Sequence, residues 1–127
     1  MARHLAEHAL EAARQSADLD LVGVANLNLG ETLLKLGDSH GAEAAAGAAL
    51  GHFTAVENTW RCVQALQLIG DVFRDRGDAG AASRAYTAGI ERAREIGADV
   101  ESRRLGERLL ELAAMAPRID PHFAAGD

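Results

Sequence analysis

The sequence predicts an all-α protein of about six helices, stacked in antiparallel pairs as an α-solenoid. Alanine, the strongest helix former, accounts for 27 of the 127 residues. The two prolines are Pro117 and Pro121, so no proline interrupts a helix before them. The chain also matches itself at a spacing of about 40 residues, and a repeat of this length indicates stacked helix pairs.

The repeat is most evident when the chain is shifted by 40 residues. This shift aligns the following positions: Leu29-Gly30 with Ile69-Gly70, Gly37-Asp38 with Gly77-Asp78, Ala42 with Ala82, Ala45 with Ala85, and Leu50 with Ile90. A further shift of 40 brings in Ala2, Ala9 and Leu10, and a shift of 36 from Ile69-Gly70 reaches Leu105-Gly106. The regular spacing of these matches indicates duplication of one helix–turn–helix unit.

The first two helices are expected at residues 2–17 and 20–36. The expected buried face of the first one carries these apolar residues: Leu5, Ala6, Ala9, Leu10 and Ala13. A turn around Asp18 and Asp20 starts the second helix. Gly37 ends the second helix, because glycine readily takes the left-handed conformation found after a helix C-terminus.

A third helix, 39–54, follows Asp38, whose carboxylate accepts backbone N–H bonds at the helix start. This helix contains Gly41, Gly47 and Gly51, which together weaken it by roughly 2–3 kcal/mol relative to alanine. We therefore expect it to be either the most mobile helix or the one packed most closely.

The fourth and fifth helices repeat this arrangement at 59–76 and 79–97. A short linker precedes Thr59, where the fourth helix begins. Gly77 ends the fourth helix and Asp78 caps the fifth, as Gly37 and Asp38 do one repeat earlier.

The sixth helix is expected at 99–116, with Asp99 as its cap. Residues 117–127 contain both prolines and are expected to form an extended or partly disordered C-terminal tail. The predicted domain organisation is therefore one helical repeat domain, 1–116, followed by this tail.

Glycine recurs inside the first helix of each pair, at Gly30, Gly70 and Gly106. A glycine within a helix costs about 1 kcal/mol relative to alanine, so a packing reason is expected. We expect a partner helix to cross at close range at each of these positions. Ala42 and Ala82 are expected to be small because the paired helices meet near the turn.

Charge and composition exclude several classes of function. The net charge is −6, which disfavours direct nucleic-acid binding. The N-terminus lacks the apolar core of a signal peptide, and no window has the roughly 18 apolar residues of a membrane span. Cys62 is the only cysteine, which suits a reducing compartment. A cytoplasmic protein without membrane contact is predicted.

These residues resemble the tetratricopeptide repeat (TPR) family. The matching positions are the Leu/Ile-Gly pairs Leu29-Gly30, Ile69-Gly70 and Leu105-Gly106, the following large residues Leu33, Phe73 and Leu109, the small residues Ala42 and Ala82, and the aromatic Tyr86. The chain departs from the family at Asn26 and Ser102, where large residues are usual, and in its longer period. Long repeats of this kind are similar to those of bacterial signalling regulators and peptide-sensing regulators.

The resemblance extends over roughly residues 2–115 and implies a right-handed solenoid whose first helices line a concave binding face. The family pattern implies these inward positions: Val24, Leu27, Glu31, Leu34, Lys35, Gln64, Gln67, Asp71, Arg74, Asp75, Arg103, Glu107, Leu110 and Glu111. They include five acids and three bases. Ten of them are the predicted partner-binding residues: Leu27, Glu31, Lys35, Gln64, Gln67, Asp71, Arg74, Asp75, Arg103 and Glu107. A groove of this composition would prefer a peptide that carries Lys or Arg.

Several other side chains are candidates for sites. His4 and His8 lie one helical turn apart, and Asp71, Asp75 and Asp78 share a helical side, but neither set makes a convincing metal site. Cys62 is expected to be a small core residue. The aromatic residues that flank the linker, Phe53 and Trp60, are expected to pack against each other in the core; the alternative is an exposed anchor for a partner.

The sequence therefore predicts a non-catalytic scaffold that binds a protein or peptide, without cofactor or metal. The alternative is the sensory segment of a larger bacterial regulator that binds a small molecule or peptide and shifts between two states. The helix at 2–17 corresponds to the second helix of a pair. It is either a cap, which its polar outer face favours, or part of a longer array, and it raises the possibility of a homodimer.

Overall fold

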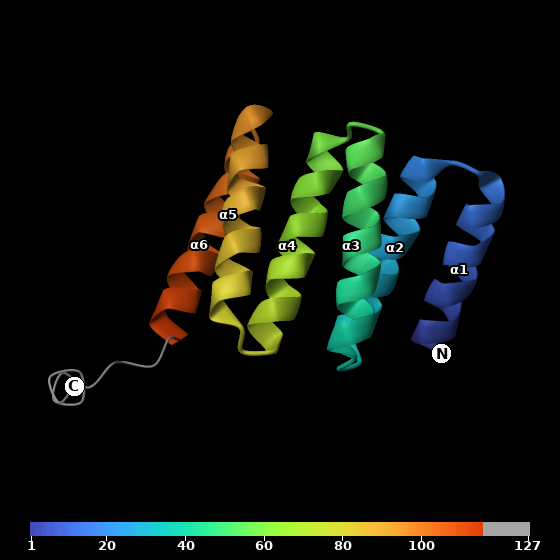
Figure 1. Ribbon diagram of the computed structural model, residues 1–127, viewed down its shortest axis with the longest axis horizontal. Helices are drawn as coiled ribbons and strands as arrows, with labels where there is room; N and C mark the ends of the chain where they lie inside the picture. The colour runs from blue at the N-terminus through green and yellow to red at the C-terminus, as the bar shows by residue number, and fades with distance from the viewer. Residues whose placement is uncertain (116–127) are drawn as a thin grey trace, which may run out of the picture.

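The computed structural model describes residues 1–115 and folds them into six α-helices without a β-strand. The helices are α1 Ala2–Ser16, α2 Leu19–Lys35, α3 Ser39–Ala55, α4 Thr59–Asp75, α5 Ala79–Glu95 and α6 Asp99–Met115. They stand side by side in a row, with α1 at one end and α6 near the other (Figure 1). The predicted all-α fold is confirmed, and the helix ends lie within two residues of their expected positions. The predicted tail, 117–127, lies outside the described residues.

Consecutive helices pack against each other, most extensively α2 with α3 and α4 with α5. These are the antiparallel pairs of the predicted repeat. On one side of the row, α4 also contacts α2 and α6, whereas within residues 1–115 helix α3 contacts neither α1 nor α5. The row is therefore curved, with α2, α4 and α6 on its concave side, as expected of a helical-repeat solenoid.

The turns inside the two complete pairs have the predicted chemistry. Gly37 and Gly77 have φ angles of 83° and 80°, in the left-handed region that suits glycine. Asp38 and Asp78 each accept a hydrogen bond from the backbone N–H three residues later, which caps α3 and α5. Helix α6 is different, because Asp99 is its first helical residue and Ala98 occupies the position of the capping aspartate. The prediction that Asp99 caps this helix is therefore wrong.

Two of the three predicted glycines mark a close approach between helices. A methyl group at Gly70 would lie 2.3 Å from the ring of Tyr86 in α5, and one at Gly30 would lie 2.9 Å from a leucine side chain of α4. A methyl group at Gly106 would meet no atom of residues 1–115 within 4 Å, so the prediction there is wrong. Helix α6 begins 40 residues after α4, so Leu110 occupies the position of Gly70.

The aromatic residues beside the α3–α4 turn do not share one environment. Phe53 is fully buried, and its ring lies 2.6 Å from the place where a methyl group on Gly23 would stand. Trp60 is 43% exposed, so its predicted position in the core is wrong. It is the second residue of α4 and extends from the start of that helix. Cys62 is buried, as predicted.

The expected buried face of α1 is only partly covered. Leu10 and Ala13 are buried and Ala6 is partly buried, as predicted. Leu5 and Ala9 are exposed instead, because among the helices of residues 1–115 only α2 packs against α1. The stripe of apolar residues is therefore wider than the surface that α2 covers.

Two of the three glycines in helix α3, Gly47 and Gly51, do not lie at a close contact with another helix. A methyl group on Gly47 or Gly51 would meet no atom of the described residues within 4 Å, so close packing does not explain these two glycines. Gly41 lies beside the Asp38 carboxylate that caps the helix. The expectation that α3 is the most mobile helix stays a prediction.

Candidate functional site

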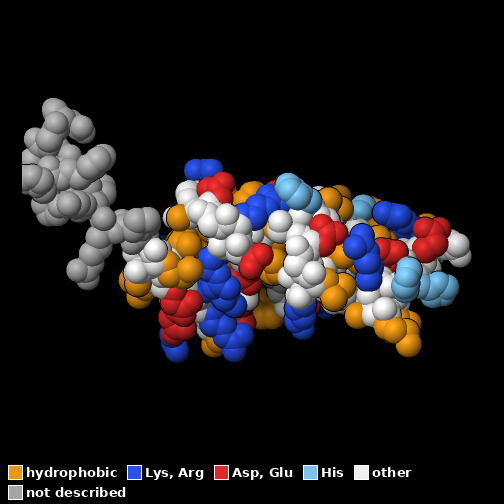
Figure 2. All heavy atoms as spheres, turned by 90° about the horizontal axis from the view of Figure 1, so that it is seen from below, with side chains coloured by type: hydrophobic (Ala, Val, Ile, Leu, Met, Phe, Trp, Pro, Cys, Tyr) orange, Lys and Arg blue, Asp and Glu red, His pale blue; other side chains and the backbone are white. Residues whose placement is uncertain are grey.

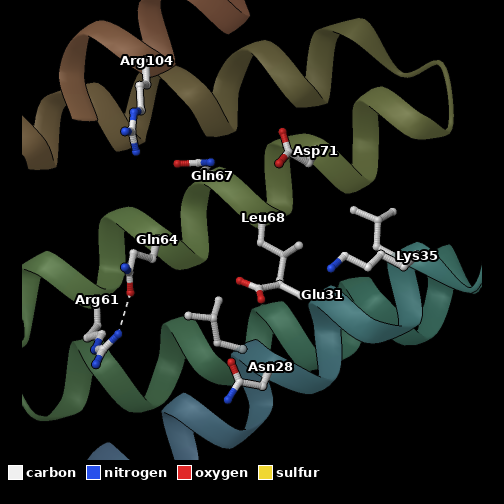
Figure 3. Close-up of a pocket in the computed structure, with 11 residues that line it drawn as sticks. Asn28, Glu31, Lys35, Arg61, Gln64, Gln67, Leu68, Asp71 and Arg104 are labelled. Carbon is white, nitrogen blue, oxygen red and sulfur yellow. Dashed lines mark hydrogen bonds between the residues drawn. The ribbon is translucent and has the colours of Figure 1, made fainter. Parts of the chain in front are cut away.

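A trough of about 590 Å³ lies on the concave side, between α2, α4 and α6. Its lining residues are Leu27, Asn28, Glu31, Leu34, Lys35, Arg61, Gln64, Gln67, Leu68, Asp71 and Arg104. Figure 3 shows the polar members of this set extending from the three helices toward the space between them. Leu27 and Leu68 are buried, so the trough has an apolar base under a polar rim.

Six of the ten predicted partner-binding residues line this trough: Leu27, Glu31, Lys35, Gln64, Gln67 and Asp71. Four predicted residues do not line it: Arg74, Asp75, Arg103 and Glu107. The repeat pattern therefore located the inward faces of α2 and α4 better than that of α6. Residues that the prediction did not include are Asn28, Arg61, Leu68 and Arg104.

The difference on α6 has a simple geometric reason. The predicted inward residue Arg103 came from a shift of 36, whereas α4 and α6 begin 40 residues apart. With a shift of 40, Gln64 of α4 corresponds to Arg104 of α6, which is the residue that lines the trough. A constant shift of 40 along the whole sequence would have found it.

Arg61 enters the trough from the first turn of α4. Asn58 caps this helix by accepting the backbone N–H of Arg61. The Arg61 guanidinium donates a hydrogen bond of 2.9 Å to the side-chain oxygen of Gln64, one turn along the same face. A guanidinium three residues before a predicted inward glutamine was a usable signal in the sequence.

Asp71 connects α4 with two neighbouring helices. It accepts a hydrogen bond from the hydroxyl of Tyr86 in α5. One of its carboxylate oxygens lies 3.8 Å from the Arg74 guanidinium and 3.6 Å from that of Arg108 in α6. Arg74 also lies 3.8 Å from Glu111 of α6. Because Arg74 and Arg108 offset the charge of Asp71, this charge is less available to a ligand than its place in the trough suggests.

The environment of Tyr86 favours its neutral form. Burial raises the pKa of the Tyr86 phenol, and the hydrogen bond to Asp71 and the charge of that carboxylate raise it further. The charges of Arg74 and Arg108 partly oppose this increase in pKa. Tyr86 therefore acts as a neutral hydrogen-bond donor that fixes the position of Asp71.

The charge of the trough differs from the acidic character that was expected. Its lining contains the cations Lys35, Arg61 and Arg104, with only Glu31 and the neutralised Asp71 as acids. The expectation counted several acids that lie outside the trough and missed two of its arginines. The trough therefore carries a local excess of positive charge in a chain whose net charge is −6.

The side chains of the trough supply hydrogen-bond donors, hydrogen-bond acceptors and charged groups. Asn28, Gln64 and Gln67 offer amide donors and acceptors that can pair with an extended peptide backbone. The guanidinium groups of Arg61 and Arg104 can bind carboxylates in bidentate geometry. A residue with a small apolar side chain would fit against the buried leucines at the base.

Within residues 1–115, no group of three or more His, Cys, Asp or Glu side chains is arranged to hold a metal ion. No helix in that range has the length and hydrophobicity needed to cross a membrane. A smaller cavity of about 350 Å³ lies beside Cys62 and is bordered by Thr54, Glu57, Thr59 and Arg92.

The trough is thus a polar, partly cationic groove formed by three successive helices on the inner side of the curve. It depends on Tyr86 and Asp71, which join α4 to α5, and on Arg108, which joins them to α6. A scan against protein-family models and a search of curated proteins found no match to this chain.

Proposed function

We propose that the chain is a non-catalytic, TPR-like scaffold that binds a protein or peptide through its concave trough. The observation that carries this proposal is the alignment of six repeat-predicted side chains around one cavity of about 590 Å³. Amide side chains, charged groups and a leucine base are the components with which helical-repeat proteins hold extended segments. The resemblance to TPR repeats also supports this proposal, because two of the glycines that carry it, Gly30 and Gly70, lie where neighbouring helices approach closely.

The preferred segment is acidic. Lys35, Arg61 and Arg104 outnumber the one acid of the trough that lacks a neutralising partner, Glu31. The guanidinium groups of Arg61 and Arg104 would orient the bound segment and select for its carboxylates, because a guanidinium matches the planar geometry of a carboxylate. Cationic side chains on a rim also accelerate association with an acidic partner.

The same proposal places the protein in the cytoplasm, as part of a bacterial signalling or regulatory system. The buried thiol of Cys62 is compatible with a reducing compartment. A scaffold without chemistry of its own acts by bringing a partner to a fixed surface, so its effect depends on affinity and on the geometry of the helix row.

Binding of two matched peptides would test the proposal. One peptide alternates Glu with Ala and the other alternates Lys with Ala, and each is titrated into isotope-labelled protein while NMR shifts are recorded. The glutamate peptide should shift the side-chain amide signals of Gln64 and Gln67, which lie inside the trough. The lysine peptide should produce smaller shifts at the same positions.

Charge reversal identifies the surface. The double variant Arg61→Glu with Arg104→Glu should weaken binding of the glutamate peptide by about tenfold or more. Arg84→Glu is the matched control, because Arg84 is an exposed residue of α5 that does not line the trough. Equal losses in both variants, or shifts confined to the convex helices, would contradict the proposed surface.

A further inference from the structure

The two ends of the helix row expose positions that are buried inside it. In α4, Gly70 is buried against the paired helix α5. The same position of α6 is Leu110, which is 73% exposed. In α1, Leu5 is 70% exposed, whereas the equivalent Ala45 and Ala85 are 6% and 8% exposed. Figure 2 shows hydrophobic side chains at the surface at both ends of the row, among charged ones.

These exposed faces belong to opposite halves of the repeated pair. By its position in the repeat, α1 is the second helix of a pair. Among the helices of residues 1–115 it packs only against α2, and its Arg3 also lies 3.5 Å from Asp38 in the α2–α3 turn. Helix α6 is the first helix of a pair, and it contacts α4 and α5 in the same range. Figure 1 places α1 and α6 at opposite ends, so these two faces cannot meet within one chain.

The complete pairs show how the sizes of facing residues are matched. Gly23 of α2 faces the ring of Phe53 in α3. A methyl group added at Gly23 would lie 2.6 Å from that ring. The equivalent residues of the second pair are Val63 in α4 and Ala93 in α5, and both are buried. A large residue on the second helix is therefore matched with glycine on the first, and a larger residue on the first is matched with alanine on the second.

The two free faces are complementary by the same rule. Gly70 of α4 faces Tyr86 of α5. At the equivalent positions, α6 has Leu110 and α1 has Ala6, so the larger residue is now on the first helix and the smaller one on the second. A leucine at this position would collide with a tyrosine, but it fits opposite an alanine.

The second level of the helices does not take part in this match, because Ala13 of α1, at the position of Ala93, is already buried in one chain. The match therefore rests on Leu110, Ala6 and the exposed Leu5 beside it. We propose that α6 of one copy packs against α1 of a second copy, so that a helix pair is completed between two chains.

This contact is heterologous, because two different surfaces meet. Each added copy presents a free α1 or α6 again, so the assembly grows as an open chain of copies. Helix α6 of one copy then lies beside α2 of the next copy, as α2 lies beside α4 within one copy. The concave face would continue across the junction, which lengthens the surface offered to an extended partner.

Two end-blocked variants test the direction of assembly. Leu5→Asp introduces a charge on the exposed face of α1, and Leu110→Asp does so on that of α6; both side chains are at least 70% exposed, so folding is preserved. The mass of the full chain is measured by sedimentation equilibrium from micromolar to millimolar concentration. Thr87→Asp, on the exposed surface of α5, is the control for added charge.

The expected masses distinguish this arrangement from any other. Wild type and Thr87→Asp should increase in mass with concentration beyond two chains, whereas each end-blocked variant alone should remain a monomer. An equimolar mixture of the two blocked variants should form a one-to-one dimer and nothing larger, because each supplies the end that the other lacks. A monomeric wild type, or self-association of either blocked variant alone, would overturn the proposal.

Cross-linking gives a second measurement that does not depend on the charged variants. With Ala6→Cys and Leu110→Cys in the same chain, oxidation should produce a ladder of disulfide-linked multimers on a non-reducing gel. Cys62 is buried and is left unchanged. The chain with only Leu110→Cys should give no product larger than a dimer, and a ladder from that single variant would count against a head-to-tail contact.

Discussion

The helix pairs α2–α3 and α4–α5 each enclose one buried aromatic ring, but at different positions along the helices. In the first pair, Phe53 near the end of α3 packs on Gly23 near the start of α2. In the second pair, Tyr86 in the middle of α5 packs on Gly70 in the last half of α4. Each ring is fully buried and occupies the space left by a missing side chain.

The comparison shows that the repeat conserves the fit between helices and not the residues that provide it. The position of Phe53 is occupied by Ala93 in the second pair, and there Val63 replaces Gly23. The second arrangement has an additional consequence, because the Tyr86 hydroxyl reaches Asp71 at the trough. The Phe53 ring makes only apolar contacts in the first pair. The Tyr86 ring in the second pair also positions Asp71, a polar group of the candidate site.

The largest expected effect comes from removing the ring of the first pair. Phe53→Ala should lower the free energy of unfolding by about 3–5 kcal/mol, because it deletes a fully buried ring and leaves a cavity. Adding Gly23→Val recreates the Val/Ala match found at Val63 and Ala93, and should recover about 1–2 kcal/mol. Urea denaturation followed by circular dichroism measures both values.

Gly23→Val alone is the control for this rescue. When Phe53 is present, the added valine side chain would collide with its ring, so Gly23→Val alone should destabilise the fold by about 1–3 kcal/mol. If Gly23→Val were equally harmful with and without the ring, the two residues would not be coupled, and the proposed exchange of volume between pairs would be incorrect.

A second prediction compares two glycines that the sequence pattern treats as equivalent. Gly70→Ala should destabilise by about 1–3 kcal/mol, because its methyl group would lie 2.3 Å from the Tyr86 ring. Gly106→Ala should stabilise by up to about 1 kcal/mol, because the site is open and alanine favours helix. Thermal unfolding of the two variants measures the sign of each change. Two changes of the same sign would contradict the different environments of these glycines.

The sequence predicted the helices well because their signals are local. Asp38 and Asp78 cap helices through bonds to N–H groups three residues away, and Gly37 and Gly77 end helices through their own backbone angles. The repeat spacing also predicted which helices form antiparallel pairs. Trp60 was harder to place, because its exposure depends on the neighbours of the first turn of α4 and not on its own position in the repeat.

The candidate site was less predictable because its charge depends on contacts between distant segments. Asp71 is acidic in the sequence, but in the fold it accepts a hydrogen bond from Tyr86, and two arginines from α4 and α6 offset its charge. A spacing error of four residues on α6 moved its predicted inward positions about one turn along the helix and rotated them by about 40°. The prediction therefore included Arg103 in place of Arg104.

A third prediction concerns the hydroxyl that only the second pair has. Tyr86→Phe should destabilise by about 1 kcal/mol, since it removes one hydrogen bond and keeps the ring in place. Phe53 offers the contrast, because it fills its pair without such a bond. Urea denaturation of this variant at neutral pH gives the value, and an unchanged stability would show that the bond to Asp71 contributes nothing to the fold.

The pH dependence of the same group gives a fourth prediction. The pKa of Tyr86 is raised by burial and by Asp71, so the unfolded chain releases the phenolic proton first as the pH rises. The stability from this group is fully present below about pH 10 and is lost above it. Tyr86 is the only tyrosine, so tyrosinate absorbance reports it directly. Asp71→Asn should lower its pKa, and an unchanged value would contradict the role of the carboxylate.

The smallest expected effect tests whether α3 is weaker than its counterpart α5. Gly47 and Gly51 lie in open space, and their equivalents in α5 are Thr87 and Glu91. Gly47→Ala and Gly51→Ala should each stabilise by about 0.5–1 kcal/mol, because alanine loses less backbone entropy in a helix. Amide hydrogen exchange should be faster in α3 than in α5 in the wild type, and the double variant should reduce that difference. If α3 instead exchanges as slowly as α5 before any change, its glycines do not limit its stability, and packing against both α2 and α4 dominates the behaviour of the helix.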